Sequence, residues 1–137
     1  MPDKKLPLMV LYDTGESWFV KPDKLVAIFI DSDREAVYVK DIEKTDYLTA
    51  RSICDQMEDD NLFWCIPTDK QLQKLLNVFD EFNETAKLTG AEPMKKGKYW
   101  SRRRLYNGVR VGVNFGLEKE VAISECEYAY TRPFLRL

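Results

Sequence analysis

The feature that most constrains the fold of this chain is the order of its hydrophobic patterns, some of which are typical of strands and others of helices. Apolar residues fall at helical spacing from about Asp46 to Met57, and again from Thr68 to a point before Gly90. The segments before and after this block carry the short apolar or alternating runs that are typical of strands. Strands, then two helices, then strands predict an α+β fold rather than an alternating parallel sheet. With 137 residues, we expect one domain over 1–137.

The first third of the chain predicts a hairpin. Leu25–Ile30 is a continuous apolar run of β-formers, and Glu35–Lys40 alternates, so the two segments pair across a turn at Asp31–Arg34. The acidic residues of this turn resemble the start of a calcium loop, but the sixth-position glycine and the twelfth-position glutamate are missing. Leu6–Leu11 surrounds a proline, which indicates an edge strand.

The helices and the later strands have sharper boundaries. Thr68 and Gln71 form a capping-box pattern, and the apolar stripe that follows it predicts one continuous helix past Phe82. The later strands are predicted at Lys98–Ser101, Gly108–Phe115, Val121–Ser124 and Ala129–Leu137. Glycines at positions 108, 112 and 116 indicate twist, bulges or close approach of backbones.

Charge is distributed unevenly along the chain. Residues 1–92 hold 11 basic and 19 acidic side chains, residues 93–117 hold seven basic and no acidic ones, and residues 118–137 hold three and four. The formal net charge of −2 therefore conceals a strongly basic segment. Such a segment attracts anions, an effect that salt weakens. The alternative is a solvated basic face that balances an acidic body.

The chain lacks residues that many catalytic and metal sites need. It has no histidine, and its three cysteines, Cys54, Cys65 and Cys126, lie far apart. The commonest general base and metal ligand is therefore missing, and three thiols with one carboxylate would be an unusual zinc site. No Walker loop or G-x-S-x-G motif occurs. We predict a protein without enzymatic activity, metal or cofactor, whose cysteines are buried and reduced. A disulfide between any two of them is the alternative, and it would leave the third thiol unpaired.

The candidate binding residues lie in the basic segment, where arginines alternate with aromatic and amide side chains. They are Arg102, Arg103, Arg104, Tyr106, Asn107 and Arg110. Guanidinium groups bind carboxylate, sulfate or phosphate in a bidentate manner, and aromatic faces stack on sugars or bases. The composition therefore suits an anionic glycan, a nucleic acid or an acidic protein surface. Alternatively, Trp100 is a core residue and the arginines form a solvated loop.

Four short motifs resemble a bacterial domain family with a C-type-lectin-like fold. Residues 63–68 followed by 71–72 resemble its W-R-L-P-T … E-L signature, and an upstream helix with Ala50 and Cys54 resembles its A…C helix. Residues 97–101 resemble its G-x-Y-W-S-S strand, and residues 130–134 resemble its closing Y-V-R-P-V. The family is similar to the C-terminal domains of bacterial collagen-like adhesins, and more distantly to retroelement variable proteins and formylglycine-generating enzymes.

The resemblance implies a twisted antiparallel sheet with two helices, in which the N- and C-terminal strands pair. It implies that the loops after the Y-W-S strand form the exposed binding face. It also implies structural roles for the motif residues. These are Trp64, Pro67, Thr68, Tyr99, Trp100, Arg132 and Pro133.

The chain departs from the pattern of the family that it resembles in ways that bear on function. Glu92-Pro93-Met94 only approaches the E-P-N tripeptide of calcium-dependent lectins, and no W-N-D occurs, so we expect binding without calcium. The oxidising enzymes of the wider superfamily need two close cysteines near the C-terminus, where this chain has Cys126 alone. Arg102 replaces a usual serine, which makes the expected binding face unusually basic.

The sequence therefore leads to a non-enzymatic recognition module for a protein or an anionic glycan. Nucleic-acid binding through the same patch is an alternative, which the sequence pI near 5.3 disfavours. A second alternative is a structural subunit of a larger assembly. A third is a small enzyme that uses carboxylates, which would need two close carboxylates in one pocket. No signal peptide or apolar span is evident, so a cytoplasmic or phage-particle location is expected, with the oligomeric state open.

Overall fold

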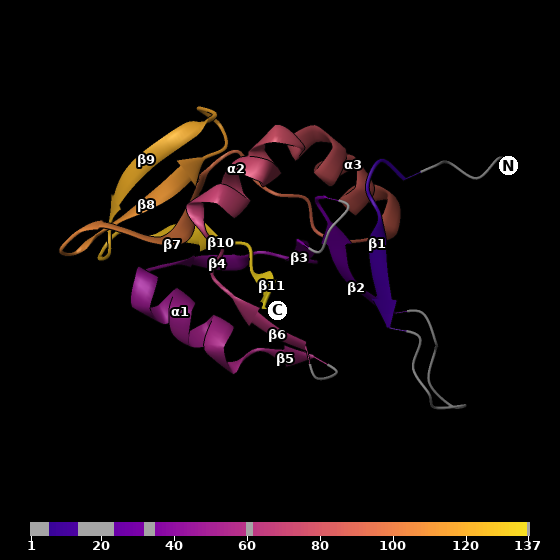
Figure 1. Ribbon diagram of the computed structural model, residues 1–137, viewed down its shortest axis with the longest axis horizontal. Coiled ribbons are helices and arrows are strands. Elements are labelled where there is room, and N and C mark those ends of the chain that lie inside the picture. The colour runs from indigo at the N-terminus through magenta and orange to yellow at the C-terminus, as the bar shows by residue number, and fades with distance from the viewer. Residues whose placement is uncertain (1–5, 14–23, 32–34, 60–61, 137) are drawn as a thin grey trace, which may run out of the picture.

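The computed structural model describes residues 6–13, 24–31, 35–59 and 62–136. Within these residues the chain forms three helices and two sheets that are rich in antiparallel pairs, which confirms the predicted α+β class (Figure 1). The turn predicted at 31–34 lies mostly outside the described residues. The hairpin on either side of it is present, because Ala27 pairs with Tyr38 and Phe29 with Ala36.

The first sheet contains both ends of the described chain. Its order is β1-β2-β3-β11-β6-β5. The strands are β1 (Val10–Asp13), β2 (Lys24–Phe29), β3 (Ala36–Tyr38), β5 (Glu58–Asp59), β6 (Leu62–Cys65) and β11 (Phe134–Arg136). β1 lies at the edge, as Pro7 indicated. The expected direct pairing of the first and last strands is wrong, since β2 and β3 lie between β1 and β11.

The second sheet has the order β4-β10-β7-β8-β9. Its strands are β4 (Ile42–Thr45), β7 (Lys98–Tyr106), β8 (Val109–Asn114), β9 (Lys119–Ser124) and β10 (Ala129–Thr131). The single strand predicted over 129–137 is wrong, because β10 joins this sheet whereas β11 joins the other. The chain crosses between the sheets at Arg132 and Pro133. Proline has no amide hydrogen for a ladder, and its carbonyl accepts from the Tyr38 amide at 2.8 Å.

The first two helices begin close to their predicted starts. α1 (Tyr47–Gln56) starts after Asp46, whose carboxylate accepts from the Thr49 amide at 2.9 Å. α2 (Asp69–Asn77) starts after Thr68, and both hydrogen bonds of the capping box are formed. The expected continuous second helix is wrong, because Val78 leaves helical geometry (φ −118°, ψ 24°) and a separate α3 (Phe79–Thr89) follows. The break redirects α3 so that its apolar face packs into the core that α2 also covers.

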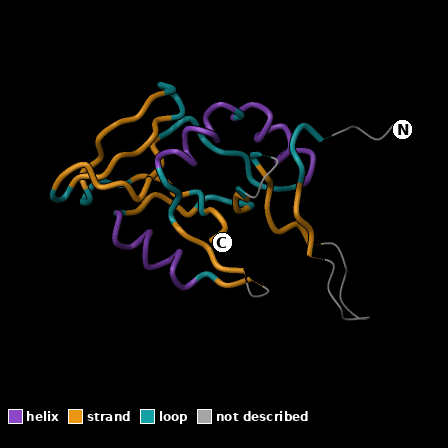
Figure 2. Tube along the Cα trace, viewed as in Figure 1, coloured by secondary structure: helices purple, strands orange, loops and turns teal. Residues whose placement is uncertain are grey.

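The helices lie on opposite faces of the hairpin that β7 and β8 form. α2 and α3 lie on one side and α1 on the other (Figure 1). On the α2–α3 side, Tyr99 and Val113 pack with Leu72 and Phe82. On the α1 side, Trp100 packs in a second cluster of buried side chains. The far end of this hairpin extends beyond the helices (Figure 2).

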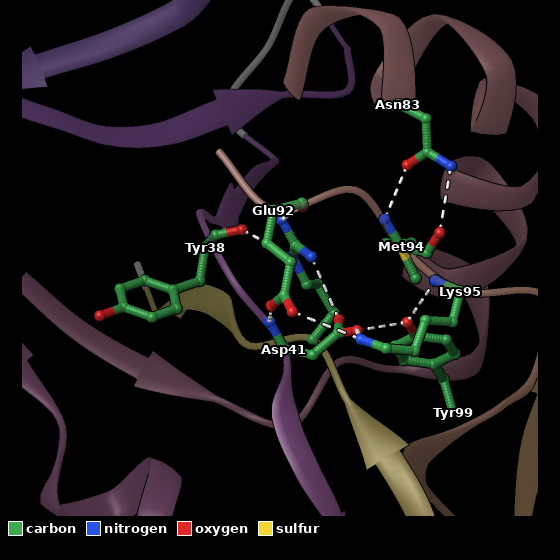
Figure 3. Close-up of polar contacts among 8 residues, drawn as sticks. Tyr38, Asp41, Asn83, Glu92, Met94, Lys95 and Tyr99 are labelled. Carbon is green, nitrogen blue, oxygen red and sulfur yellow. Dashed lines mark hydrogen bonds and ion pairs between the residues drawn. The ribbon is translucent and has the colours of Figure 1, made fainter. Parts of the chain in front are cut away.

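A buried ionic network ties the two sheets together around Arg132, whose side chain is fully buried. Its guanidinium donates to the Tyr38 carbonyl at 2.8 Å, to the Glu92 carbonyl at 2.6 Å and to the Asp41 carboxylate at 3.1 Å. The other Asp41 oxygen accepts from the Tyr99 hydroxyl at 2.7 Å and from Lys95 at 3.1 Å (Figure 3). Burial, with the nearby Asp41 carboxylate, raises the pKa of Tyr99, so its hydroxyl keeps the proton that it donates.

Gly112 is the glycine at which backbones approach most closely. A Cβ on this residue would lie 2.7 Å from the Tyr99 carbonyl oxygen and would overlap the Ile123 side chain. We expect Gly112→Ala to lower the free energy of unfolding by about 1–3 kcal/mol, because the carbonyl belongs to a paired strand and cannot move freely. Urea denaturation measures this change. Gly97→Ala is the matched control, since its Cβ would contact only the side chain of the half-buried Tyr130, at 3.3 Å, and no backbone. An equal loss in both variants would contradict the prediction.

Candidate functional site

The basic run lies on a strand and not on a loop. β7 was predicted to end at Ser101, but it continues to Tyr106, and Arg104 pairs with Arg110 of β8. A two-residue turn at Asn107 and Gly108 closes the hairpin, with Gly108 in the left-handed region at φ +76°. The expectation that these arginines occupy a loop is therefore wrong. The local run of charged residues gave no reason to extend the strand beyond Ser101. Pairing with β8 is what extends it to Tyr106.

A strand separates neighbouring side chains onto opposite faces, so the three consecutive arginines do not form one patch. Arg102 lines a cavity on the α1 side together with Arg110. Arg104 pairs with Arg110 across the ladder, so its side chain leaves from that same face. Arg103 lines a different cavity, with Leu105 and Val111.

An irregularity in β7 presents Arg102 to the α1 side. The register with β8 shifts between Trp100 and Arg104, and the backbone groups that this shift frees find other partners. The Arg102 amide donates to the Pro67 carbonyl at 2.8 Å, and the buried Ser101 hydroxyl donates to the Val111 carbonyl at 2.6 Å. These hydrogen bonds fix the backbone of the bulge at Arg102.

Arg110 is fixed by contacts on three sides. Its Nε donates to Glu125 at 2.7 Å, and its NH1 donates to the Arg102 carbonyl at 2.8 Å. The guanidinium lies over the Tyr47 ring, 4.0 Å from the ring centroid. Such stacked and paired guanidinium groups are held rigidly. Burial raises the pKa of Tyr47, so its phenol stays protonated at neutral pH.

These residues surround a cavity of about 340 Å³ between α1 and strands β6 to β8, which we call the arginine cavity. Its lining residues are Tyr47, Arg51, Cys54, Asp55, Cys65, Ile66, Arg102 and Arg110. Three guanidinium groups and the Asp55 carboxylate line it, and a second carboxylate, that of Glu125, pairs with Arg110 beside it. Arg51 and Asp55 are 4.0 Å apart and both exposed, so their ion pair is weak. Arg102 is the guanidinium of the three that has no ion pair with a described residue. The cavity therefore favours an anion.

Arg103 is engaged elsewhere. Its NH1 lies 2.7 Å from the carboxylate of Asp69, the first residue of α2. The hydrogen bond from Arg103 lowers the pKa of Asp69, and the same bond raises the pKa of Arg103. Arg103 thus joins β7 to the start of α2 on the face opposite the arginine cavity.

The remaining candidate residues lie apart from the cavity. Tyr106 is exposed at the tip of the hairpin, and Asn107 is exposed in the turn. Neither lines the arginine cavity. Of the six residues proposed from the sequence, the structure therefore brings Arg102 and Arg110 together in it and adds Arg104 beside them.

The residues of the family-like motifs lie in or beside the core. Trp64 and Trp100 are fully buried, and the indole nitrogen of Trp100 donates to the Thr45 carbonyl at 2.9 Å. Pro67 is buried and supplies the carbonyl that receives the Arg102 amide. Thr68 caps α2, and Pro133 is buried at the crossing between the sheets.

Sequence reasoning missed the α1 side of the cavity. Tyr47, Arg51, Cys54 and Asp55 come from one helix, at positions i, i+4, i+7 and i+8. This spacing places them on one helical face, which was a usable signal. This helical face lies beside Arg102, which is about fifty residues later in the chain, only because of tertiary packing.

Comparisons with known proteins leave this site to be interpreted from its geometry. A scan against protein-family models found no match, and a search of curated proteins found none either. Across the described ranges, no helix has both the length and the apolar character needed to cross a membrane. In the same part of the chain, no three cysteine or acidic side chains converge as metal ligands would.

Proposed function

We propose that this chain is a non-enzymatic recognition module that binds the anionic group of a glycan or a protein in the arginine cavity, without calcium. The observation that carries the proposal is the convergence of Arg51, Arg102 and Arg110 around one cavity. Arg110 is rigid, whereas the side chain of Arg102 makes no ion pair or hydrogen bond with any described residue. Its guanidinium therefore has its donors available for a carboxylate or sulfate.

Two further groups suit a ligand that carries hydroxyl or amide donors beside its charge. The Asp55 carboxylate, half-exposed at the rim, accepts hydrogen bonds. The protonated Tyr47 phenol adds a polar group to an aromatic wall. Uronic acids, sulfated sugars and acidic peptide segments all carry this combination of charge and neighbouring donors.

We also propose that the fold is C-type-lectin-like. Four family-like motifs in their expected order support this proposal. The burial of Trp64 and Trp100 agrees with the structural roles that the resemblance implies. β11 shares a sheet with the early strands, next to β3 rather than to β1.

The experiment compares ligand binding by variants of arginines that line the arginine cavity with binding by a variant of Arg103, which lies on the opposite face of β7. We expect Arg102→Ser to weaken binding of an acidic glycan about tenfold or more, because one charge-assisted hydrogen bond contributes about 1.5–3 kcal/mol. Arg51→Ser should weaken it similarly, and Arg103→Ser should leave it unchanged. A glycan array with sulfated and uronic-acid sugars, read in chelator at two salt concentrations, selects the probe, and calorimetry then measures the variants.

The outcomes separate the hypotheses. Equal weakening by Arg102→Ser and Arg103→Ser would contradict a site inside the arginine cavity. Loss of binding in chelator would contradict calcium independence. Silence of the array, followed by binding to a single-stranded oligonucleotide with an affinity that falls steeply with salt, would favour the nucleic-acid alternative.

A further inference from the structure

β9 is an edge strand with few of the features that protect such strands from pairing. It is the outermost strand of the second sheet, and its six residues pair with β8 in continuous register, without a bulge. It contains no proline, and its charged residues, Lys119 and Glu120, stand together at its start. Natural edge strands are usually blunted by bulges, prolines or central charges, and an unprotected one is a template for another strand.

The hydrogen bonds of β9 define which backbone groups face outward. The Glu125 amide donates to the Gly108 carbonyl at 2.8 Å, and in an antiparallel ladder such pairs alternate. Residues 119, 121 and 123 therefore bond to β8, whereas residues 120, 122 and 124 direct their amides and carbonyls away from it. The groups of Ser124 are already used, since its carbonyl accepts from the Glu127 amide at 2.9 Å and its amide donates to the Glu127 carboxylate at 3.3 Å. Glu120 and Ala122 remain.

We propose that two copies of this chain pair antiparallel through β9, with the two-fold axis at Val121. This register sets Glu120 of each copy opposite Ala122 of the second copy, so the two outward-facing residues of one strand meet the two of the other. All four amides and carbonyls gain partners in this way. In this register an odd-numbered residue of one β9 lies opposite an odd-numbered residue of the other. Side chains of the same face therefore stay on the same face across the junction between the two copies.

Charge and shape beside the strand also fit a second copy. A groove of about 280 Å³ on the face away from α1 has apolar walls, including Leu105 and Ala122, and has Arg103 and Glu120 among its lining residues. In the proposed register, Glu120 of one copy comes beside Ala122 of the other and therefore approaches the groove that contains Arg103. NH1 of Arg103 keeps its bond to Asp69 in its own chain, so Glu120 of the second copy would meet the other guanidinium nitrogens. The contact occurs twice, once on each side of the axis, as a two-fold interface requires.

The paired sheet would have ten strands, and both arginine cavities would open on the same side of it, because the two-fold axis is perpendicular to the sheet. This consequence rests on the proposed function, whereas the pairing itself does not. A polymer with repeated anionic groups would then engage two cavities at once.

Ala122→Pro is the test variant. Its amide points away from β8, so proline removes the outward donor without breaking a hydrogen bond within the monomer. Ala122→Ser keeps that amide and is the matched control. We expect the wild type and Ala122→Ser to sediment at twice the monomer mass at high protein concentration, and Ala122→Pro to sediment as a monomer.

Amide hydrogen exchange keeps the inference falsifiable even if the proline variant folds poorly. In the wild type, exchange at the Glu120 and Ala122 amides should slow as protein concentration rises, while exchange at surface amides such as that of Asn107 should not change. A wild type that stays monomeric over the whole concentration series would overturn the proposal. A dimer that persists in folded Ala122→Pro, or whose Ala122 amide exchanges at an unchanged rate, would also overturn it. None of these results depends on anion binding.

Discussion

Replacing Arg132 with methionine should lower the free energy of unfolding by about 3–5 kcal/mol, the typical cost of removing one partner from a buried ion pair. The guanidinium is fully buried and joins the carbonyls of Tyr38 and Glu92 to the carboxylate of Asp41. Burial lowers the pKa of Arg132, and the Asp41 carboxylate opposes that shift. Methionine fills similar space but donates nothing, so two carbonyls and part of a carboxylate lose their partner in a dry environment.

Urea denaturation at neutral pH measures this loss. Lys96→Met is the matched control, because it makes the same change of cation to thioether on an exposed side chain. Surface substitutions of this kind usually change stability by less than about 0.5 kcal/mol. A comparably small loss for Arg132→Met would mean that the network does not hold the sheets together.

Trp100→Ala should cost about 3–5 kcal/mol, since it removes the largest side chain of the cluster that joins α1 to the second sheet. The indole packs edge-on against Tyr47, with ring centroids 5.5 Å apart. Tyr47 in turn supports the Arg110 guanidinium. The substitution therefore affects the wall of the arginine cavity as well as the core.

Trp100→Phe separates packing from hydrogen bonding. Phenylalanine keeps most of the apolar volume but leaves the Thr45 carbonyl without its donor, so we expect a smaller loss of about 1–3 kcal/mol. Leu117→Ala, at a side chain that is 62% exposed, is the surface control and should be near neutral. Thermal and urea unfolding that rank Trp100→Phe below Trp100→Ala in stability would contradict this account of the cluster.

The sequence indicated the elements better than their connections. Local signals located α1 and α2, because Asp46 and Thr68 cap them through side-chain bonds to nearby amides. The same signals missed the break at Val78, since the apolar stripe continues through it. They also missed the division of residues 129–137 between two sheets, which depends on long-range pairing with β7 and β3.

The candidate site was predictable in its composition but not in its geometry. Charge counting identified Arg102, Arg103 and Arg104 as one group, and in a loop their side chains could have formed one patch. The unexpected extension of β7 places Arg102 and Arg103 on opposite faces, because successive strand residues alternate. Arg51 joins the site only through packing of α1 on the sheet, which no local pattern in the sequence specifies.

The bulge in β7 bears on how such a surface can diversify. Between Trp100 and Arg104 the register of the strand with β8 shifts. There the Arg102 amide donates to the Pro67 carbonyl and the Arg103 amide to the Ser101 hydroxyl, rather than to the ladder. Inserting one residue at this point would change which of Arg102 and Arg103 faces α1, while the flanking pairs of Trp100 and Arg104 stay intact. Descendants of this gene could thus acquire a new ligand preference by a change in length alone, with every amino acid of the site retained.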